Sequence, residues 1–173
     1  ASTLEVHEEL YGDSHPKVAD VLRLMGEVEL EHGDLDEAQG HVERARSILE
    51  DTVGPLALET ISVTRLGARV ALAQGRLDDA ELLATRSSDA LALFSTLRHD
   101  IDRGDGLLIL GDVMRARGDR EAAKATYEKA KIYHYDGRWP AYPLLRLSTL
   151  ALDDGDSKTA IALAREAAQV LDA

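Results

Sequence analysis

The chain has 173 residues and no cysteine, and its 32 acidic residues outnumber its 20 basic residues to give a formal net charge of −12. This length suits one domain, and the lack of cysteine excludes disulfides, thiol catalysis and cysteine-based metal sites. Residues 1–37 hold eleven acidic and two basic residues, which argues against direct nucleic-acid binding because phosphate would be repelled. No apolar run is long enough to cross a membrane, so we expect a soluble, cytoplasmic protein.

Apolar residues recur with helical spacing along the chain, and the breaks in that spacing predict nine helices. In chain order they cover residues 2–11, 16–32, 35–50, 57–74, 77–95, 101–117, 120–133, 140–154 and 157–172. The first is the outer helix of an incomplete leading repeat, residues 1–11, and the others pair into four repeats, residues 16–50, 57–95, 101–133 and 140–172. We expect one all-α domain over residues 1–173. Because the chain has no initiator methionine and its first helix has no partner, we also expect a piece of a longer protein whose uncapped ends can self-associate.

A glycine with an alanine five positions later marks each predicted turn between paired helices. The pairs are Gly33/Ala38, Gly75/Ala80, Gly118/Ala123 and Gly155/Ala160, and their glycines lie 42, 43 and 37 residues apart. A period of this size predicts stacked helix hairpins. The glycine can end the first helix in the left-handed conformation, and a following aspartate, as at Asp34, Asp119 and Asp156, can cap the second. Small residues seven positions before each turn glycine should let the paired helices approach closely; they are Gly26, Ala68, Gly111 and Ser148.

Two segments repeat one longer spacing of leucine, glycine and alanine. The residues are Leu22, Gly26, Gly33, Ala38, Val42 and Ala45 in one segment and Leu107, Gly111, Gly118, Ala123, Tyr127 and Ala130 in the other. This pattern resembles the signature of the tetratricopeptide repeat (TPR) family. The long period and residues 11–16 are similar to kinesin-light-chain repeats, and residues 90–94 with 110–112 are similar to the repeats of bacterial regulators and signal-transducing nucleotidases. The resemblance implies a right-handed superhelical solenoid of antiparallel helix hairpins, with a concave groove lined by the first helix of each repeat.

The resemblance also assigns side chains to that groove. They are Asp20, Arg23, Glu27, Glu31, Ser62, Arg65, Arg69, Ala73, Asp105, Leu108, Asp112, Arg115, Tyr142, Leu145, Thr149 and Asp153. The candidates for partner binding among them are Arg23, Glu27, Arg65, Arg69, Leu108, Asp112, Arg115 and Tyr142. Arg65 and Arg69 lie one turn apart and are suited to bind an acidic side chain or a phosphate. The alternative is that these arginines pair with Glu27, Glu31 or Asp112 on neighbouring helices.

Most of the aromatic residues gather around the junction between the third and fourth repeats. They are Tyr127, Tyr133, Tyr135, Trp139 and Tyr142, five of the seven aromatic residues in the chain. Because aromatic and arginine side chains concentrate at binding hot spots, Arg138, Trp139 and Tyr142 are candidates for partner binding. The alternative is a small satellite core that packs the loop between the repeats.

Catalytic patterns are incomplete in this sequence. Residues 100–106 lack the ligands of a calcium loop, the six histidines form no His-Glu-x-x-His pair, and there is no nucleophile elbow. We therefore expect no enzyme activity, no cofactor and no metal. The leading hypothesis is a non-enzymatic protein-protein interaction scaffold that binds a peptide, a helix or a neighbouring domain in its concave groove. The alternative is the effector-sensing or autoinhibitory TPR region of a bacterial transcriptional regulator or signal-transducing nucleotidase.

Overall fold

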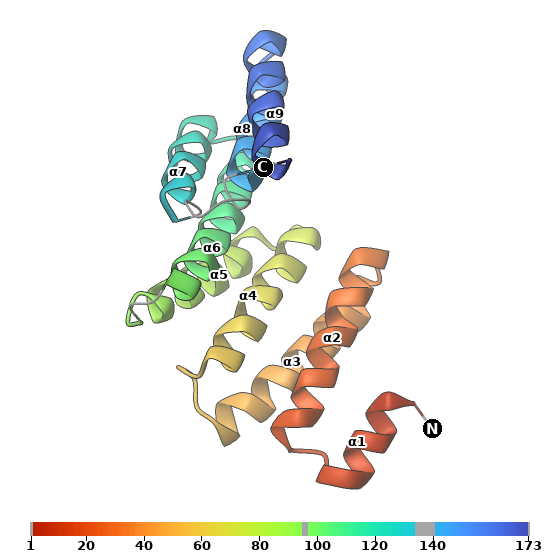
Figure 1. Ribbon diagram of the computed structural model, residues 1–173. Helices are drawn as coiled ribbons and strands as arrows, with labels where there is room; N and C mark the ends of the chain where they lie inside the picture. The colour runs from red at the N-terminus through yellow and green to blue at the C-terminus, as the bar shows by residue number, and fades with distance from the viewer. Residues whose placement is uncertain (1, 95–96, 134–140, 173) are drawn as a thin grey trace. The chain divides into compact units, whose positions relative to one another are not determined.

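The computed structural model describes residues 2–94, 97–133 and 141–172. Within these residues the chain forms nine α-helices and no strand (Figure 1). The helices are α1 (Thr3–Tyr11), α2 (Pro16–His32), α3 (Leu35–Thr52), α4 (Leu58–Ala73), α5 (Leu77–Leu91), α6 (Leu97–Ala116), α7 (Arg120–Tyr133), α8 (Ala141–Asp153) and α9 (Ser157–Leu171). The predicted all-α class is confirmed, and the largest differences from the predicted bounds are that α5 ends at Leu91 and α6 begins at Leu97.

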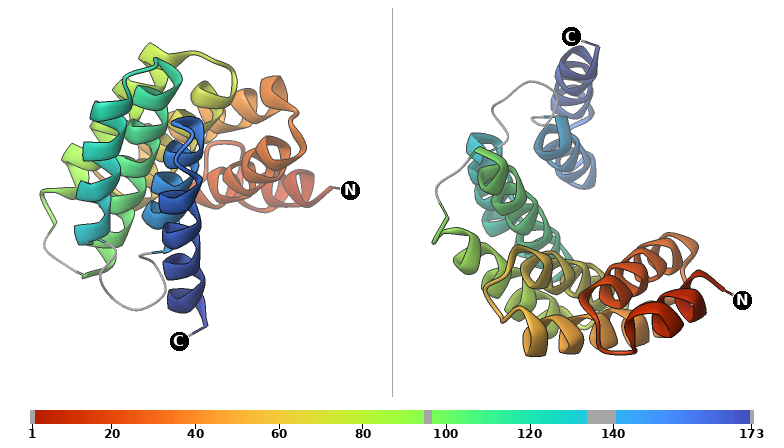
Figure 2. Two further views of the ribbon diagram at one scale, coloured as in Figure 1. Left: turned by 90° about the horizontal axis from the view of Figure 1, so that it is seen from above. Right: turned by 60° about the horizontal axis from the view of Figure 1, so that its bottom comes forward.

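The chain divides into two compact units, unit 1 over residues 1–90 and unit 2 over residues 91–173. In unit 1, α2 pairs with α3, α4 packs on α3, and α1 lies against α2. In unit 2, α6 pairs with α7 and α8 with α9, while α7 also packs against α8. Figures 1 and 2 show these pairs running side by side. The predicted hairpins are therefore the building blocks of both units.

The four turn glycines adopt the left-handed conformation that the sequence predicts. Their φ angles lie between 75° and 88°, a region that favours glycine; the residues are Gly33, Gly75, Gly118 and Gly155. Capping by the following aspartate is confirmed for Asp119 and Asp156, which accept from backbone N–H groups three residues on. It is wrong for Asp34, whose side chain makes no capping hydrogen bond. Asp36 and Glu37 place negative charge in the first turn of α3 instead.

Close helix approach occurs where two of the small residues lie. A Cβ atom on Gly26 would lie 2.9 Å from Val42 Cγ2 and 3.4 Å from the carbonyl oxygen of Ala38. The backbone of α2 at Gly26 therefore lies directly against the Val42 side chain of α3. At Gly111 the corresponding Cβ would overlap the ring of Tyr127 on α7. Tyr127 is fully buried and belongs to the core of unit 2. The glycine on the first helix therefore makes room for the large residue on the second.

Candidate binding surface of the first helices

Three of the charged candidates of unit 1 take part in ion pairs on α2 and α4. Arg23 donates from Nη1 to Glu27 Oε1 at 2.8 Å within α2. Arg69 donates from Nη2 to Glu31 Oε1, also at 2.8 Å, and this bond links α4 to α2. The alternative of pairing between neighbouring helices is therefore realised for Arg69, and the ion pair is largely exposed, because the side chains of Arg69 and Glu31 are 43% and 72% accessible.

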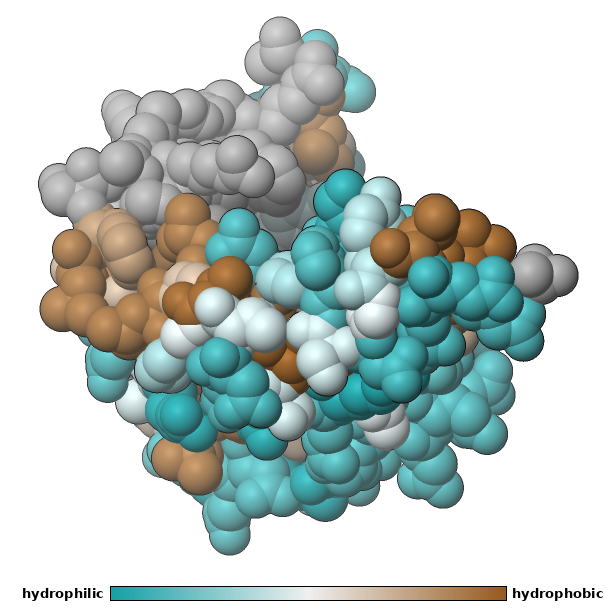
Figure 3. All heavy atoms as spheres, turned by 90° about the horizontal axis from the view of Figure 1, so that it is seen from below, coloured by the Kyte–Doolittle hydropathy of each residue, from teal (hydrophilic) through white to brown (hydrophobic). Residues whose placement is uncertain are grey.

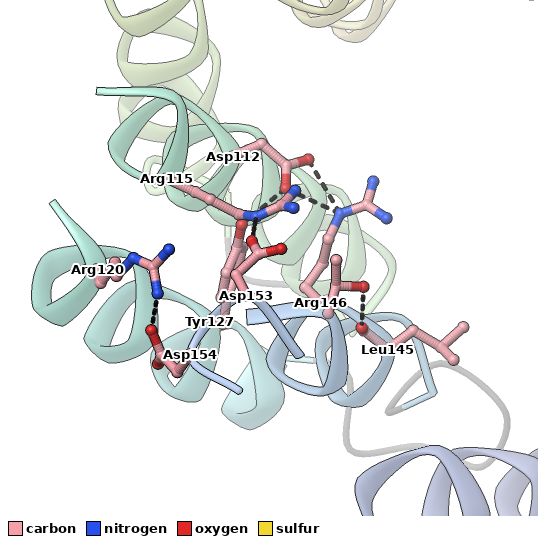
Figure 4. Close-up of polar contacts among 9 residues, drawn as sticks. Asp112, Arg115, Arg120, Tyr127, Leu145, Arg146, Asp153 and Asp154 are labelled. Carbon is pink, nitrogen blue, oxygen red and sulfur yellow. Dashed lines mark hydrogen bonds and ion pairs between the residues drawn. The ribbon is translucent and has the colours of Figure 1, made fainter. Parts of the chain in front are cut away.

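In unit 2, Asp112 is the centre of a polar cluster that joins three helices (Figure 4). From α7, the hydroxyl of Tyr127 donates to Asp112 Oδ1 at 2.8 Å. From α8, Arg146 Nε lies 2.9 Å from the same oxygen and 3.0 Å from Oδ2. Burial, together with the Asp112 carboxylate, raises the pKa of the Tyr127 phenol, so this hydroxyl keeps its proton as a donor.

Two further ion pairs of unit 2 lie beside this cluster. Arg115 donates from Nε to Asp153 Oδ2 at 2.6 Å and so ties the end of α6 to the end of α8. Arg120 at the start of α7 pairs with Asp154, which follows α8 (Figure 4). The two candidates Asp112 and Arg115 are thus held in place by bonds to the next hairpin.

Two partners in these contacts were missing from the predicted binding residues: Arg146 and the hydroxyl of Tyr127. The sequence carried one signal for Arg146, since it lies 34 residues after an acidic residue, Asp112, and has the opposite charge. That spacing alone does not give the direction of either side chain.

The remaining candidates differ in their surroundings. Leu108 is only 8% exposed and packs in the same core as Tyr127. Tyr142 on α8 is 49% exposed. Arg138 and Trp139 lie outside the described residues, as does Tyr135. The predicted aromatic group is thus divided, because Tyr127 is a core residue of the α6–α7 hairpin and Tyr142 lies at the surface.

Exposed apolar side chains occur in pairs on α1 and α2. Val6 and Leu10 are 39% and 68% exposed, and Leu24 and Val28 are 52% and 55% exposed. Each pair is spaced four residues apart and therefore shares one side of its helix. Figure 3 shows a hydrophobic patch beside the amino-terminal end of the chain, next to hydrophilic residues, and a second hydrophobic area on the left of the same view. These side chains supply apolar surface for the self-association expected from the sequence, which stays a prediction.

The described helices include none that is both long and apolar enough to span a membrane. Among the same residues, no group of three or more histidine and acidic side chains is arranged to hold a metal ion. The polar clusters above are instead carboxylates paired with arginines and one tyrosine.

Arg115 lowers the pKa of the Asp153 carboxyl, chiefly through its hydrogen bond. A carboxyl whose pKa is lower in the folded state contributes stability above its unfolded pKa, and this contribution is lost as the pH falls through the folded pKa.

We expect Arg115→Gln to raise the pKa of Asp153 toward its ordinary value in an NMR titration of the carboxyl carbons. Asp156 serves as the internal control, because its pKa is lowered by hydrogen bonds from Thr159 and should not change. Identical titration of Asp153 in both proteins would contradict the bond.

Two sequence models described as tetratricopeptide repeats match this chain, one over residues 1–51 and the other over residues 63–84 and 104–129. Together these matches cover more than half of the chain. The chain belongs to the tetratricopeptide repeat family. No curated protein sequence matches it significantly.

Solved structures of other TPR proteins share this fold. BtubC (BKLC) from P. vanneervenii superposes with a TM-score of 0.71 at 15% identity, over 90% of this chain and 64% of that one. A putative kinesin light chain of Podosopora anserina with nearly identical TPR-like repeats gives 0.70, also at 15% identity, over 96% of this chain and 81% of that one. A variant of the latter gives 0.72. At this identity the likeness shows the TPR fold alone.

Proposed function

We propose that this TPR domain is a non-enzymatic protein-interaction module that binds a peptide, a helix or a neighbouring domain along the first helices of its repeats. TPR domains generally bind proteins, and both matching sequence models describe a repeat rather than a catalytic domain. The first helices are α2 and α4 in unit 1 and α6 and α8 in unit 2. The family pattern assigns side chains of these four helices to the concave groove, and of these Leu108 is buried.

The observation that carries this proposal is the bonding of exposed charges between successive first helices. Arg69 on α4 is held by Glu31 on α2, and Arg115 on α6 is held by Asp153 at the end of α8. Their partners fix these side chains before any ligand arrives, yet each arginine is still about one third or more exposed. A partner therefore meets oriented donors and acceptors and loses less side-chain entropy on binding.

Helix α8 also carries exposed apolar side chains. Tyr142 and Leu145 are 49% and 40% exposed and lie three residues apart, so they share one side of the helix. An exposed aromatic beside an aliphatic side chain is suited to supply apolar area next to oriented charges. From the sequence alone, we also propose Arg138 and Trp139 as partner-binding residues.

A charge reversal on α4 tests the proposal. We expect peptides selected from a random display library with the purified chain to bind at least tenfold more weakly to Arg69→Glu, a loss of about 1.4 kcal/mol, and the loss should shrink at high salt because the contact is electrostatic. Isothermal titration calorimetry at two salt concentrations measures both effects. Arg65→Glu, one helical turn away on the same side of α4, should also weaken peptide binding.

The matched control is Arg44→Glu on α3. Arg44 also forms an exposed ion pair, with Glu8, and its side chain is 41% accessible, close to the 43% of Arg69. Both variants make the same charge change and break one ion pair, but only Arg69 lies on a first helix. Equal loss of affinity in the two variants, or failure to select any peptide, would refute binding along α2 and α4.

A further inference from the structure

Unit 1 contains a pocket on the side of α4 that faces away from Arg65 and Arg69. It has a volume of about 290 Å³, with α3 and α5 as its walls and α4 as its floor. Val63 and Gly67 lie on the floor of the pocket. Arg65 lies two positions after Val63, and Arg69 lies two positions after Gly67. Two residues are separated by about 200° around a helix, so the pocket and the proposed partner surface use opposite sides of α4.

Gly67 lines the pocket without a side chain of its own. A Cβ atom there would lie 3.4 Å from Val42 Cγ1 on α3 and 3.5 Å from Leu83 Cδ1 on α5, which is ordinary contact. At the Cβ position of residue 67 the space is therefore about as wide as one methyl group, and apolar atoms bound it on both sides.

The other repeats hold a large residue at this position. It directly precedes the small residue of each first helix and is Met25 in α2, Leu110 in α6 and Leu147 in α8. Leu147 is only 4% exposed, and Leu110 packs partly buried against the core of unit 2. Gly67 thus leaves empty a position that the other repeats fill with an apolar side chain.

Three arginines and two carboxylates line the pocket, so the formal charge of its lining is +1. Asp79 pairs with Arg76 at 2.8 Å, whereas Glu43 accepts a 2.7 Å hydrogen bond from the neutral side chain of Gln39 and keeps its negative charge. Arg46 has only a distant partner, Glu50 at 3.9 Å. Arg86, which also lines the pocket, forms no hydrogen bond or ion pair within the described part of the chain. An occupant would therefore meet guanidinium groups from α3 and α5, and these groups favour an anion.

We propose that this pocket binds a small molecule in which a carboxylate is joined to an apolar chain. The apolar chain lies over Gly67 between Val42 and Leu83, and the carboxylate pairs with Arg86 and Arg46. The volume is at the low end of the ~300–1000 Å³ found for ligand pockets, which suits a compact ligand. This site goes beyond the proposed protein interaction and does not depend on it.

Octanoate is the probe that tests this site, and octylammonium, with the same chain length and the opposite charge, is its control. We expect millimolar octanoate to shift the backbone amide NMR signals of Val70 and Leu83 in a saturable way, whereas octylammonium should not. No saturable shift with octanoate, or equal shifts with the two amphiphiles, would overturn the proposal.

Two variants separate the apolar and charged parts of the site. Gly67→Leu places in α4 the residue that α6 and α8 carry at this position, so it should raise the thermal midpoint and abolish octanoate binding. Arg86→Gln changes an exposed side chain, so it should fold normally and weaken binding at least tenfold. Arg86→Gln therefore decides the question even if Gly67→Leu does not fold.

The control variants are Arg44→Gln, which lies outside the pocket, and Arg69→Glu on the opposite side of α4. Both should bind octanoate like the wild type. If octanoate binding survives Gly67→Leu in a folded protein, or if Arg44→Gln weakens it as much as Arg86→Gln, the amphiphile binds elsewhere and the proposal fails. Failure of peptide selection would leave this result unchanged, so the two proposals are tested separately.

Discussion

Replacing Tyr127 by alanine is expected to lower the free energy of unfolding of unit 2 by about 3–5 kcal/mol, the range for removing a buried aromatic side chain. The ring is fully buried, lies against Gly111 and packs with Leu107 and Leu147. Truncation would leave a cavity between α6 and α7, since the glycine opposite has no side chain to fill it. Urea denaturation followed by circular dichroism measures the change.

Tyr127→Phe separates the ring from its hydroxyl. This variant keeps the packing and loses only the hydrogen bond to Asp112, which still has Arg146 as a donor. We expect a loss of about 1 kcal/mol, the usual net value of one hydrogen bond. If the alanine variant were no less stable than the phenylalanine variant, Tyr127 would not be the core residue that the structure shows.

Gly111→Ala is expected to destabilise unit 2 by about 1–3 kcal/mol through overpacking, although alanine is ordinarily the better helix former by about 1 kcal/mol. The added Cβ would overlap the ring of Tyr127. That ring cannot move aside easily, because it is fully buried and its hydroxyl is bonded to Asp112. Denaturation midpoints of variant and wild type give the sign of the change.

Gly40→Ala on α3 is the matched control for Gly111→Ala. A Cβ atom on Gly40 would meet no atom within 4 Å, so this variant should gain about 0.5–1 kcal/mol from backbone entropy. Opposite signs at the two helical glycines are the expected result. On a Tyr127→Leu background the penalty at Gly111 should shrink, because the overlapping ring is gone. The same sign at both glycines would show that Gly111 is not needed for close approach.

The hairpins could be predicted from the sequence because their determinants are local. Gly33 and Gly118 end first helices in a conformation that few other residues adopt. Gly26 and Gly111 stand at fixed distances before those turns and meet Val42 and Tyr127 as the repeat pattern requires. Each of these features depends on residues within one hairpin, so periodicity was enough to find them.

The polar cluster around Asp112 could not be predicted in the same way. It needs side chains from α6, α7 and α8, and Arg146 reaches it from 34 residues away. A repeat pattern gives the register of a residue on its helix, but it does not give the rotamer that brings a guanidinium to a particular carboxylate. Leu108 shows the same limit, since its groove position in the pattern coincides with a buried position in unit 2.

The empty position over Gly67 has a consequence for how this chain can change over time. We expect a single substitution to leucine there to improve both helix propensity and packing, so selection for stability alone would favour loss of the pocket. Engineering this domain by repeat consensus would erase the pocket in its first round, and a thermal assay would score that loss as an improvement. Libraries built on this scaffold should therefore keep residue 67 constant and judge variants by ligand binding as well as by melting temperature.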